Sequence, residues 1–214
     1  MRRTQVSINL TALRHNLQRV HQAAPGCRVM AAIKANGYGH GLVRVAQALN
    51  DSDSFGVACL DEALRLRAAG VSAPITLLEG FFHADELPLI QRHQLDVLLH
   101  HEHQIIALER ATLRTPIRVW LKIDTGMHRL GVSPESAPSL WHRLASLPAL
   151  QLMGQMTHLA CADERDHPAT GQQLSQFAQA TEGLPGERAI ANSAGILGWP
   201  ETHSDWVRPG IMLY

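Results

Sequence analysis

The 214-residue sequence has few cysteines and no surplus of charge of either sign. Its three cysteines, Cys27, Cys59 and Cys161, are isolated and odd in number, which argues against a disulfide framework or a zinc ribbon. Lysine plus arginine and aspartate plus glutamate each number 19, so the formal net charge is zero. This balance argues against a protein that binds nucleic acid or an anionic membrane surface.

The sequence also lacks a long apolar run, and no segment approaches the length that crosses a membrane. The first ten residues, MRRTQVSINL, start basic but contain no continuous apolar segment, which argues against a signal peptide. We therefore expect a cytoplasmic protein. Hydrophobic residues make up 45% and charged residues 18% of the chain, a composition typical of globular proteins with a full core.

Short apolar runs alternate with amphipathic stretches, which is the pattern of repeated βα units. Eight such units joined by right-handed crossovers close most simply into a (β/α)8 TIM-type barrel, with a doubly wound open sheet as the alternative. The strands are predicted at residues 28–34, 54–60, 74–79, 95–99, 117–124, 151–158, 188–192 and 205–208.

Amphipathic helices are predicted between these strands, in residues 61–70, 101–111, 133–147 and 169–184. In the first of them, Asp61 is placed to cap the helix and Gly70 to end it. The sequence contains no linker, low-complexity segment or internal repeat between these elements.

Both ends of the chain differ from a complete barrel. Residues 4–10 alternate polar and apolar side chains like a strand, although eight other strands already account for the barrel. We therefore expect residues 1–10 to form a strand that pairs elsewhere and residues 11–214 to form the barrel. Only six residues follow Arg208, so we expect further protein beyond Tyr214 and leave open whether the barrel closes fully at this end.

Reactive side chains follow the ends of several predicted strands. Because the carboxyl ends of barrel strands meet on one face, these side chains are expected to converge on one mouth. Each has a structural alternative, as a solvated lysine, a helix cap, an interior histidine or an ion-paired arginine. Their coincidence on one rim favours a functional site. The residues are Lys34, Arg129, His158, Asn192, Ser193 and Arg208.

These side chains suit a cofactor that carries both an aldehyde and a phosphate. A partly desolvated lysine at the position of Lys34 can form a Schiff base with a carbonyl. The Ser193 hydroxyl and the backbone amides of the SAG and PGI segments provide an anion-binding arrangement. Pyridoxal phosphate has both groups, and Arg208 would face its pyridine nitrogen.

Several segments resemble the landmarks of the alanine racemase family, in the same order along the chain. They are AAIKANGYGHG, LKIDTGMHRLGV, HLACAD, NSAG and DWVRPGIMLY. The resemblance covers nearly the whole chain, and the long lysine segment is its most specific part. It implies a pyridoxal-phosphate-dependent isomerase of fold type III that interconverts L- and D-alanine. The D-alanine would serve as a peptidoglycan precursor. This chain resembles only the N-terminal barrel domain of that family.

The resemblance also implies roles for individual residues. Lys34 would hold the cofactor covalently and act as the base on one face of the substrate Cα. Arg208 would contact the pyridine nitrogen with His158 behind it, while Arg129 would bind near the phenolic oxygen and the substrate carboxylate. Lys122 matches a position that is carbamylated in some family members, where it holds that arginine. The other implied cofactor-binding residues are Tyr38, Asn192, Ser193, Gly210 and Ile211.

Racemisation needs two acid/base groups on opposite faces of Cα, and Lys34 can be only one of them. In the family, the second is a tyrosine from the C-terminal β-domain of the partner subunit in a homodimer. That domain is not in this sequence, and the predicted strand at residues 1–10 would pair with it. We therefore expect this 214-residue chain by itself to be inactive or very weak as a racemase.

Two other functions fit parts of the sequence. A single-domain barrel that binds pyridoxal phosphate without catalysis would fit the length and the first lysine, but not the KANGYGHG and GMHRLG segments. A metal-dependent barrel hydrolase would use histidines, of which the chain has 13. However, the HHEH cluster at residues 100–103 lies at a predicted helix start, so we predict no metal site.

Overall fold

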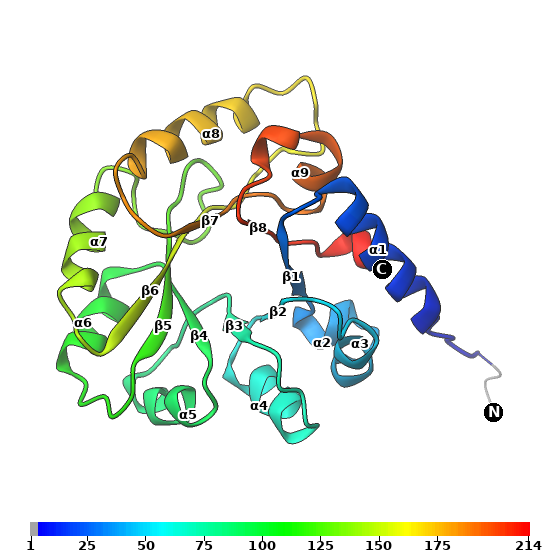
Figure 1. Cartoon of the computed structure of the whole chain (residues 1–214), viewed down its shortest axis with the longest axis horizontal. Helices are drawn as coiled ribbons and strands as arrows, with labels where there is room; N and C mark the ends of the chain where they lie inside the picture. Colours follow the sequence, from blue (N-terminus) through cyan, green and yellow to red (C-terminus); the bar gives the residue numbers. More distant parts are fainter. Residues whose placement is uncertain (1–3) are drawn as a thin grey trace.

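The computed structural model describes residues 4–214, and these form eight parallel strands that close into a barrel (Figure 1). Each strand pairs with the next along the chain, and the last pairs with the first through Val29 and Val207. The closed strand order confirms the predicted TIM-type barrel and excludes the open sheet. Because the last strand pairs with the first, the barrel is also closed at the C-terminal end of the chain. The strands are β1 (Arg28–Ala32), β2 (Ser54–Val57), β3 (Ile75–Leu77), β4 (Asp96–Leu99), β5 (Ile117–Lys122), β6 (Leu150–Met156), β7 (Glu187–Ala189) and β8 (Trp206–Val207).

Most strands end one to three residues earlier than predicted, because the regular ladder of parallel hydrogen bonds stops before the polar residues of the mouth. The prediction that Lys34 ends the first strand is wrong, since β1 ends at Ala32. Similarly, β6 ends at Met156 rather than at His158. Apart from Lys122, which is the last residue of β5, the site residues therefore lie beyond the strands, where their backbones follow loop and helix-start conformations.

Helices surround the barrel, and the four that were predicted are all present, with shorter bounds (Figure 1). Gly70 ends α4 as predicted: it follows the C-cap residue Ala69 and has a φ of 82°. The prediction that Asp61 caps α4 is wrong: the N-cap is Cys59, and Asp61 lies in the first turn. The α-helices are α1 (Leu10–Ala23), α2 (Lys34–Tyr38), α3 (Leu42–Ala48), α4 (Leu60–Ala68), α5 (Leu87–Arg92), α6 (Glu102–Arg110), α7 (Ala137–Ala145), α8 (Ala169–Ala180) and α9 (Ser193–Gly198). Short 3-10 turns occur at Ala84–Glu86, Pro200–Thr202 and Ile211–Leu213.

The N-terminal segment differs from its prediction. Residues 4–9 contain no strand, and α1 begins at Leu10 with the Asn9 side chain accepting from the Thr11 and Ala12 amides at 3.0 and 3.1 Å. Residues 1–3 of the predicted strand lie outside the described residues. The prediction required a pairing partner outside this chain, so the pairing of residues 1–10 stays a prediction.

Two packed layers form the core. The outer layer lies between the strands and the helices, and includes Leu13, Leu17 and Val20 on the buried face of α1. The inner layer fills the barrel below the mouth with side chains from six strands, so the barrel is not an open channel. These side chains are Met30, Leu98, Trp120, Met156, Ala189 and Trp206. Within residues 4–214, every helix is too short or too polar to cross a membrane.

Candidate functional site

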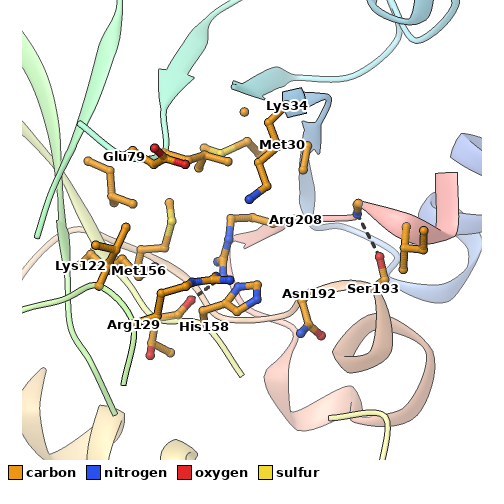
Figure 2. A pocket seen from close by; sticks show the side chains of 18 of the residues that line it. Met30, Lys34, Glu79, Lys122, Arg129, Met156, His158, Asn192, Ser193 and Arg208 are labelled. Carbon is orange, nitrogen blue, oxygen red and sulfur yellow. Dashed lines mark hydrogen bonds between the residues drawn. The ribbon is translucent and has the colours of Figure 1, made fainter. Parts of the chain in front are cut away.

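A pocket of about 460 Å³ opens at the carboxyl ends of the strands (Figure 2). It draws its lining from loops after β1, β5, β6, β7 and β8, as well as from residues inside the barrel mouth. Every residue that the sequence assigned to the site lines this pocket. They are Lys34, Tyr38, Lys122, Arg129, His158, Asn192, Ser193, Arg208, Gly210 and Ile211.

Lys34 begins α2, and the rest of this short element is left-handed. Residues 35–38 have φ between 51° and 63°, a conformation that costs roughly 1–2 kcal/mol for each residue with a Cβ. The surrounding structure holds this turn: the buried Glu62 carboxylate accepts from the amides of Asn36 and Ala58, each at 2.9 Å. The turn brings Lys34 and Tyr38 to the same pocket. Asn36 and Gly37 are residue types that favour this handedness, whereas the role of Glu62 has no signal in the sequence.

Tyr38 lies between the left-handed turn and the end of the chain. Its ring stacks on Tyr214 with centroids 4.8 Å apart, and a Cβ added at Gly210 would lie 2.5 Å from its hydroxyl oxygen. Only glycine therefore fits at position 210 without displacing Tyr38. Burial raises the pKa of Tyr38, an effect partly offset by Arg129, so the hydroxyl keeps its proton and can donate a hydrogen bond.

Ser193 and Asn192 lie together at the start of α9. The Ser193 hydroxyl oxygen accepts from the Gly210 and Met212 amides at 2.9 and 3.2 Å. Asn192 caps the helix, because its side chain accepts from the Gly195 amide at 2.9 Å, and it also donates to the Leu159 carbonyl at 3.3 Å. Asn192 therefore has the structural role of a helix cap, which was the alternative to a functional role. It also lines the pocket.

Arg208 is buried at the base of the pocket, with 8% of its surface exposed. Its Nη2 donates to the main-chain carbonyl of Thr157 and to that of Ile190, the latter at 3.2 Å. Within residues 4–214, its Nη1 has no hydrogen-bond partner, and no carboxylate forms an ion pair with the guanidinium. Burial lowers the pKa of Arg208 to about 10, which leaves it charged at neutral pH with a donor free for a ligand.

Lys34, Lys122, Arg129 and His158 surround Arg208 in Figure 2, and the Lys34 amine points into the pocket. Burial, with Arg208 and Lys122 nearby, lowers the pKa of His158 to about 3, so the imidazole is neutral. Burial and the same arginine lower the pKa of Lys122 to about 8. Four cationic side chains, Lys34, Lys122, Arg129 and Arg208, line the pocket with two carboxylates, Glu79 and Asp163. The lining is therefore positive on balance and suits an anionic ligand.

The HHEH segment has a structural place away from this pocket. His101 is the N-cap of α6, and its Nδ1 lies 2.8 Å from that of His103 on an exposed surface. In the described part of the chain, no group of three or more histidine, cysteine, aspartate or glutamate side chains is arranged to hold a metal ion.

Comparison with known proteins gives a consistent result. The protein-family model for the N-terminal domain of alanine racemase matches residues 8–214. The chain is 53% identical over 215 residues to the biosynthetic alanine racemase of Escherichia coli strain CFT073, covering all of this chain and 60% of that protein. It is 54% identical over 208 residues to alanine racemase of Pectobacterium carotovorum, covering 97% of this chain and 58% of that protein.

Solved structures show the same similarity. The biosynthetic alanine racemase from Pseudomonas aeruginosa matches with a TM-score of 0.92 and 46% identity, over 96% of this chain and 57% of that one. Alanine racemase from Acinetobacter baumannii matches with a TM-score of 0.93 and 40% identity, over all of this chain and 60% of that one. The chain thus spans no more than 60% of the length of these relatives.

Proposed function

The chain belongs to the alanine racemase family, and we propose that it is the cofactor-binding barrel of a pyridoxal-phosphate-dependent enzyme that interconverts L- and D-alanine. One observation carries the proposal: within residues 4–214, the buried Nη1 of Arg208 has no partner, in a pocket that Lys34 also lines. A buried donor without a partner costs about 1–3 kcal/mol. A ligand with an acceptor atom at this place would remove that cost.

Pyridoxal phosphate fits the donors of the pocket. Its pyridine nitrogen is an acceptor for Arg208 Nη1, its aldehyde suits the Lys34 amine, and its phosphate suits an electropositive pocket. The residues proposed to hold the phosphate are Tyr38, Ser193, Gly210 and Ile211, with Asn192 fixing the start of α9 beside them. When bound, the cofactor supplies the electron sink that makes the substrate α-proton removable.

Arg208 and His158 set the electrostatics around the cofactor nitrogen. A guanidinium is a pure donor, and with a pKa of about 10 it keeps its protons at neutral pH. The neutral imidazole of His158 adds no second charge behind it. Together they would leave the nitrogen of a bound pyridine ring unprotonated, which would make the ring a weaker electron sink and disfavour transamination as a side reaction.

Lys34 is the proposed base on one face of the substrate. Its amine removes a proton from Cα or returns it there, while Arg129, exposed at the pocket rim, binds the substrate carboxylate. The second acid/base is proposed to come from the C-terminal domain of a partner subunit in a homodimer. D-alanine formed in this way would serve as a peptidoglycan precursor in the cytoplasm.

Lys122 is the proposed support for Arg129. It is 6% exposed, and its pKa of about 8 leaves a fraction of the amine neutral under physiological conditions. A neutral amine can add carbon dioxide and lose a proton to give a carbamate, which carries a negative charge. That charge would offset the surrounding cations and pair with Arg129.

Borohydride reduction tests the proposal. The protein is incubated with pyridoxal phosphate, reduced and digested, and the labelled peptide is identified by mass spectrometry. We expect the label on Lys34. It should be absent from Lys34→Ala and present in Lys122→Met. A label on Lys122, or no label at all, would contradict the proposed cofactor site. Covalent binding at Lys34 with no racemisation, even after fusion to the C-terminal part of an alanine racemase relative, would favour a non-catalytic cofactor-binding barrel.

A further inference from the structure

Gln173 reaches from α8, on the outside of the barrel, to the loops that follow β5 and β6. Its side chain is buried, with 2% exposed, and all its hydrogen bonds go to these loops. The Nε2 group donates to the His158 carbonyl at 2.9 Å and to the Thr125 hydroxyl oxygen at 3.3 Å. The Oε1 atom accepts from the Ala160 amide at 2.9 Å. Because Ala160 offers a donor and His158 an acceptor, the orientation of the Gln173 amide is determined.

These contacts extend to Arg208 through the main chain. The hydroxyl oxygens of Thr125 and Thr157 lie 2.8 Å apart, both buried, so Gln173 and Thr125 together hold residues 157–160. The carbonyl of Thr157, in the same segment, accepts from Arg208 Nη2. Gln173 is therefore linked to the buried guanidinium by a continuous set of hydrogen bonds and one short stretch of backbone.

The direction of Arg208 Nη1 depends on this segment. The hydrogen-bond acceptors of the Arg208 side chain within residues 4–214 are the carbonyls of Thr157 and Ile190, without a carboxylate. A guanidinium is planar and rigid, so the position of its acceptors fixes where its remaining N–H groups point. A shift of the Thr157 carbonyl would turn Nη1 away from its present direction.

We propose that Gln173 is a positioning residue, which holds the segment 157–160 so that Arg208 presents Nη1, and His158 its imidazole, to a ligand in the pocket. The inference rests on the proposed function, in which the pyridine nitrogen of the cofactor would accept from Nη1. Gln173 does not line the pocket and so acts only through its neighbours. Gly126 also packs against it: a Cβ added there would lie 3.3 Å from Gln173 Cγ, so the loop that carries Arg129 rests on the same side chain.

A matched pair of variants tests the inference. Gln173→Met keeps the size of the side chain and removes its hydrogen bonds. Gln155→Met does the same at a fully buried glutamine of β6 that donates to the Pro185 carbonyl at 2.8 Å and does not line the pocket. Both variants are expected to lose stability. Only Gln173→Met is expected to bind pyridoxal phosphate about tenfold more weakly, measured by absorbance titration.

A second readout needs no cofactor. The guanidinium ¹⁵N resonance of Arg208, assigned by its loss in Arg208→Lys, is expected to shift in Gln173→Met and to stay in place in Gln155→Met. If Gln173→Met does not fold, Thr125→Val breaks the Thr125–Thr157 contact instead, and a smaller change in the same direction is expected.

The inference would be overturned if Gln173→Met changed neither the affinity for pyridoxal phosphate nor the Arg208 resonance. Equal changes in Gln173→Met and Gln155→Met would overturn it as well. Failure of the unsubstituted protein to bind pyridoxal phosphate would overturn the proposed function instead. The Arg208 resonance would then decide alone whether Gln173 positions the guanidinium: a shift supports the positioning role, and no shift refutes it.

Discussion

The main-chain N–H of Gly210 donates to the Ser193 hydroxyl oxygen at 2.9 Å and so joins the end of β8 to the start of α9. The Met212 amide donates to the same oxygen at 3.2 Å. Since Ser193 accepts from both amides, its own proton is available to a ligand. The hydroxyl thus links two segments of the pocket wall and offers a donor to the proposed phosphate site.

Ser193→Ala is expected to weaken both the fold and cofactor binding. The substitution leaves the Gly210 and Met212 amides without their acceptor, which is expected to cost about 1–2 kcal/mol in the free energy of unfolding, measured with urea. Pyridoxal phosphate should also bind less tightly in an absorbance titration. Ser146→Ala, which removes an exposed hydroxyl that donates to the Arg143 carbonyl, is the control and should change neither measurement. Equal behaviour of the two variants would contradict the role of Ser193.

Lys122→Met is expected to stabilise the cofactor-free protein at pH 7. The pKa of Lys122 is lowered from 10.5 to about 8, so the folded state binds this proton less tightly than the unfolded state does. The cost is therefore fully present below pH 8 and falls as the pH rises from 8 to 10.5. Removing the buried charge should raise the free energy of unfolding by about 1–3 kcal/mol at pH 7.

The gain from Lys122→Met should shrink as the pH approaches 10. Carbon dioxide is excluded during these measurements, because a carbamate would change the charge of Lys122. Arg19→Met, at an exposed position of α1, controls for the loss of a surface cation. A Lys122 variant that is less stable than the unsubstituted protein at pH 7 would show that the lysine is already paired in solution.

Residues 1–214 alone are expected not to racemise alanine at a useful rate, because Lys34 supplies an acid/base group on one face only. Loss of one positioned proton-transfer group typically costs about 10² to 10⁴ in rate. Fusion of residues 1–214 to the C-terminal remainder of the Escherichia coli relative should restore activity. Racemisation and α-proton exchange are measured together in deuterium oxide with L-alanine.

Exchange with retention of configuration, without racemisation, would be consistent with the chemistry of Lys34 alone. Conversion to D-alanine by residues 1–214 at the rate of the fusion would refute the two-base account. Lys34→Ala in the fusion is the matched control and should abolish both reactions.

Arg208→Glu in the fusion protein is expected to slow racemisation and increase transamination. A carboxylate at this position would hold a proton on the cofactor nitrogen and make the ring a stronger electron sink. The ratio of pyruvate formed to D-alanine formed measures the change. Arg19→Glu, at the exposed surface of α1, makes the same charge change and should leave the ratio unaltered. An unchanged ratio in Arg208→Glu would count against contact between Arg208 and the ring nitrogen.

The positions of the strands and the pocket residues follow from local patterns of the sequence. Apolar runs spaced by amphipathic stretches predict the barrel, because each βα unit buries one face of its helix against its strand. Lys34, Arg208 and the other pocket residues lie just after such strands, and the barrel brings all carboxyl ends to one mouth. Their convergence could therefore be predicted from the order of elements alone.

The tertiary structure decided how those residues are held. The left-handed turn after Lys34 depends on the Glu62 carboxylate, which comes from a different βα unit. The low pKa of His158 comes from burial among cations contributed by other strands. Gln173 reads in the sequence as an ordinary polar residue of an amphipathic helix, yet it is buried and bonded to two loops. Such contacts join residues far apart in the chain, so no local sequence pattern predicts them. The periodicity that specifies the barrel, by contrast, is present within every βα unit.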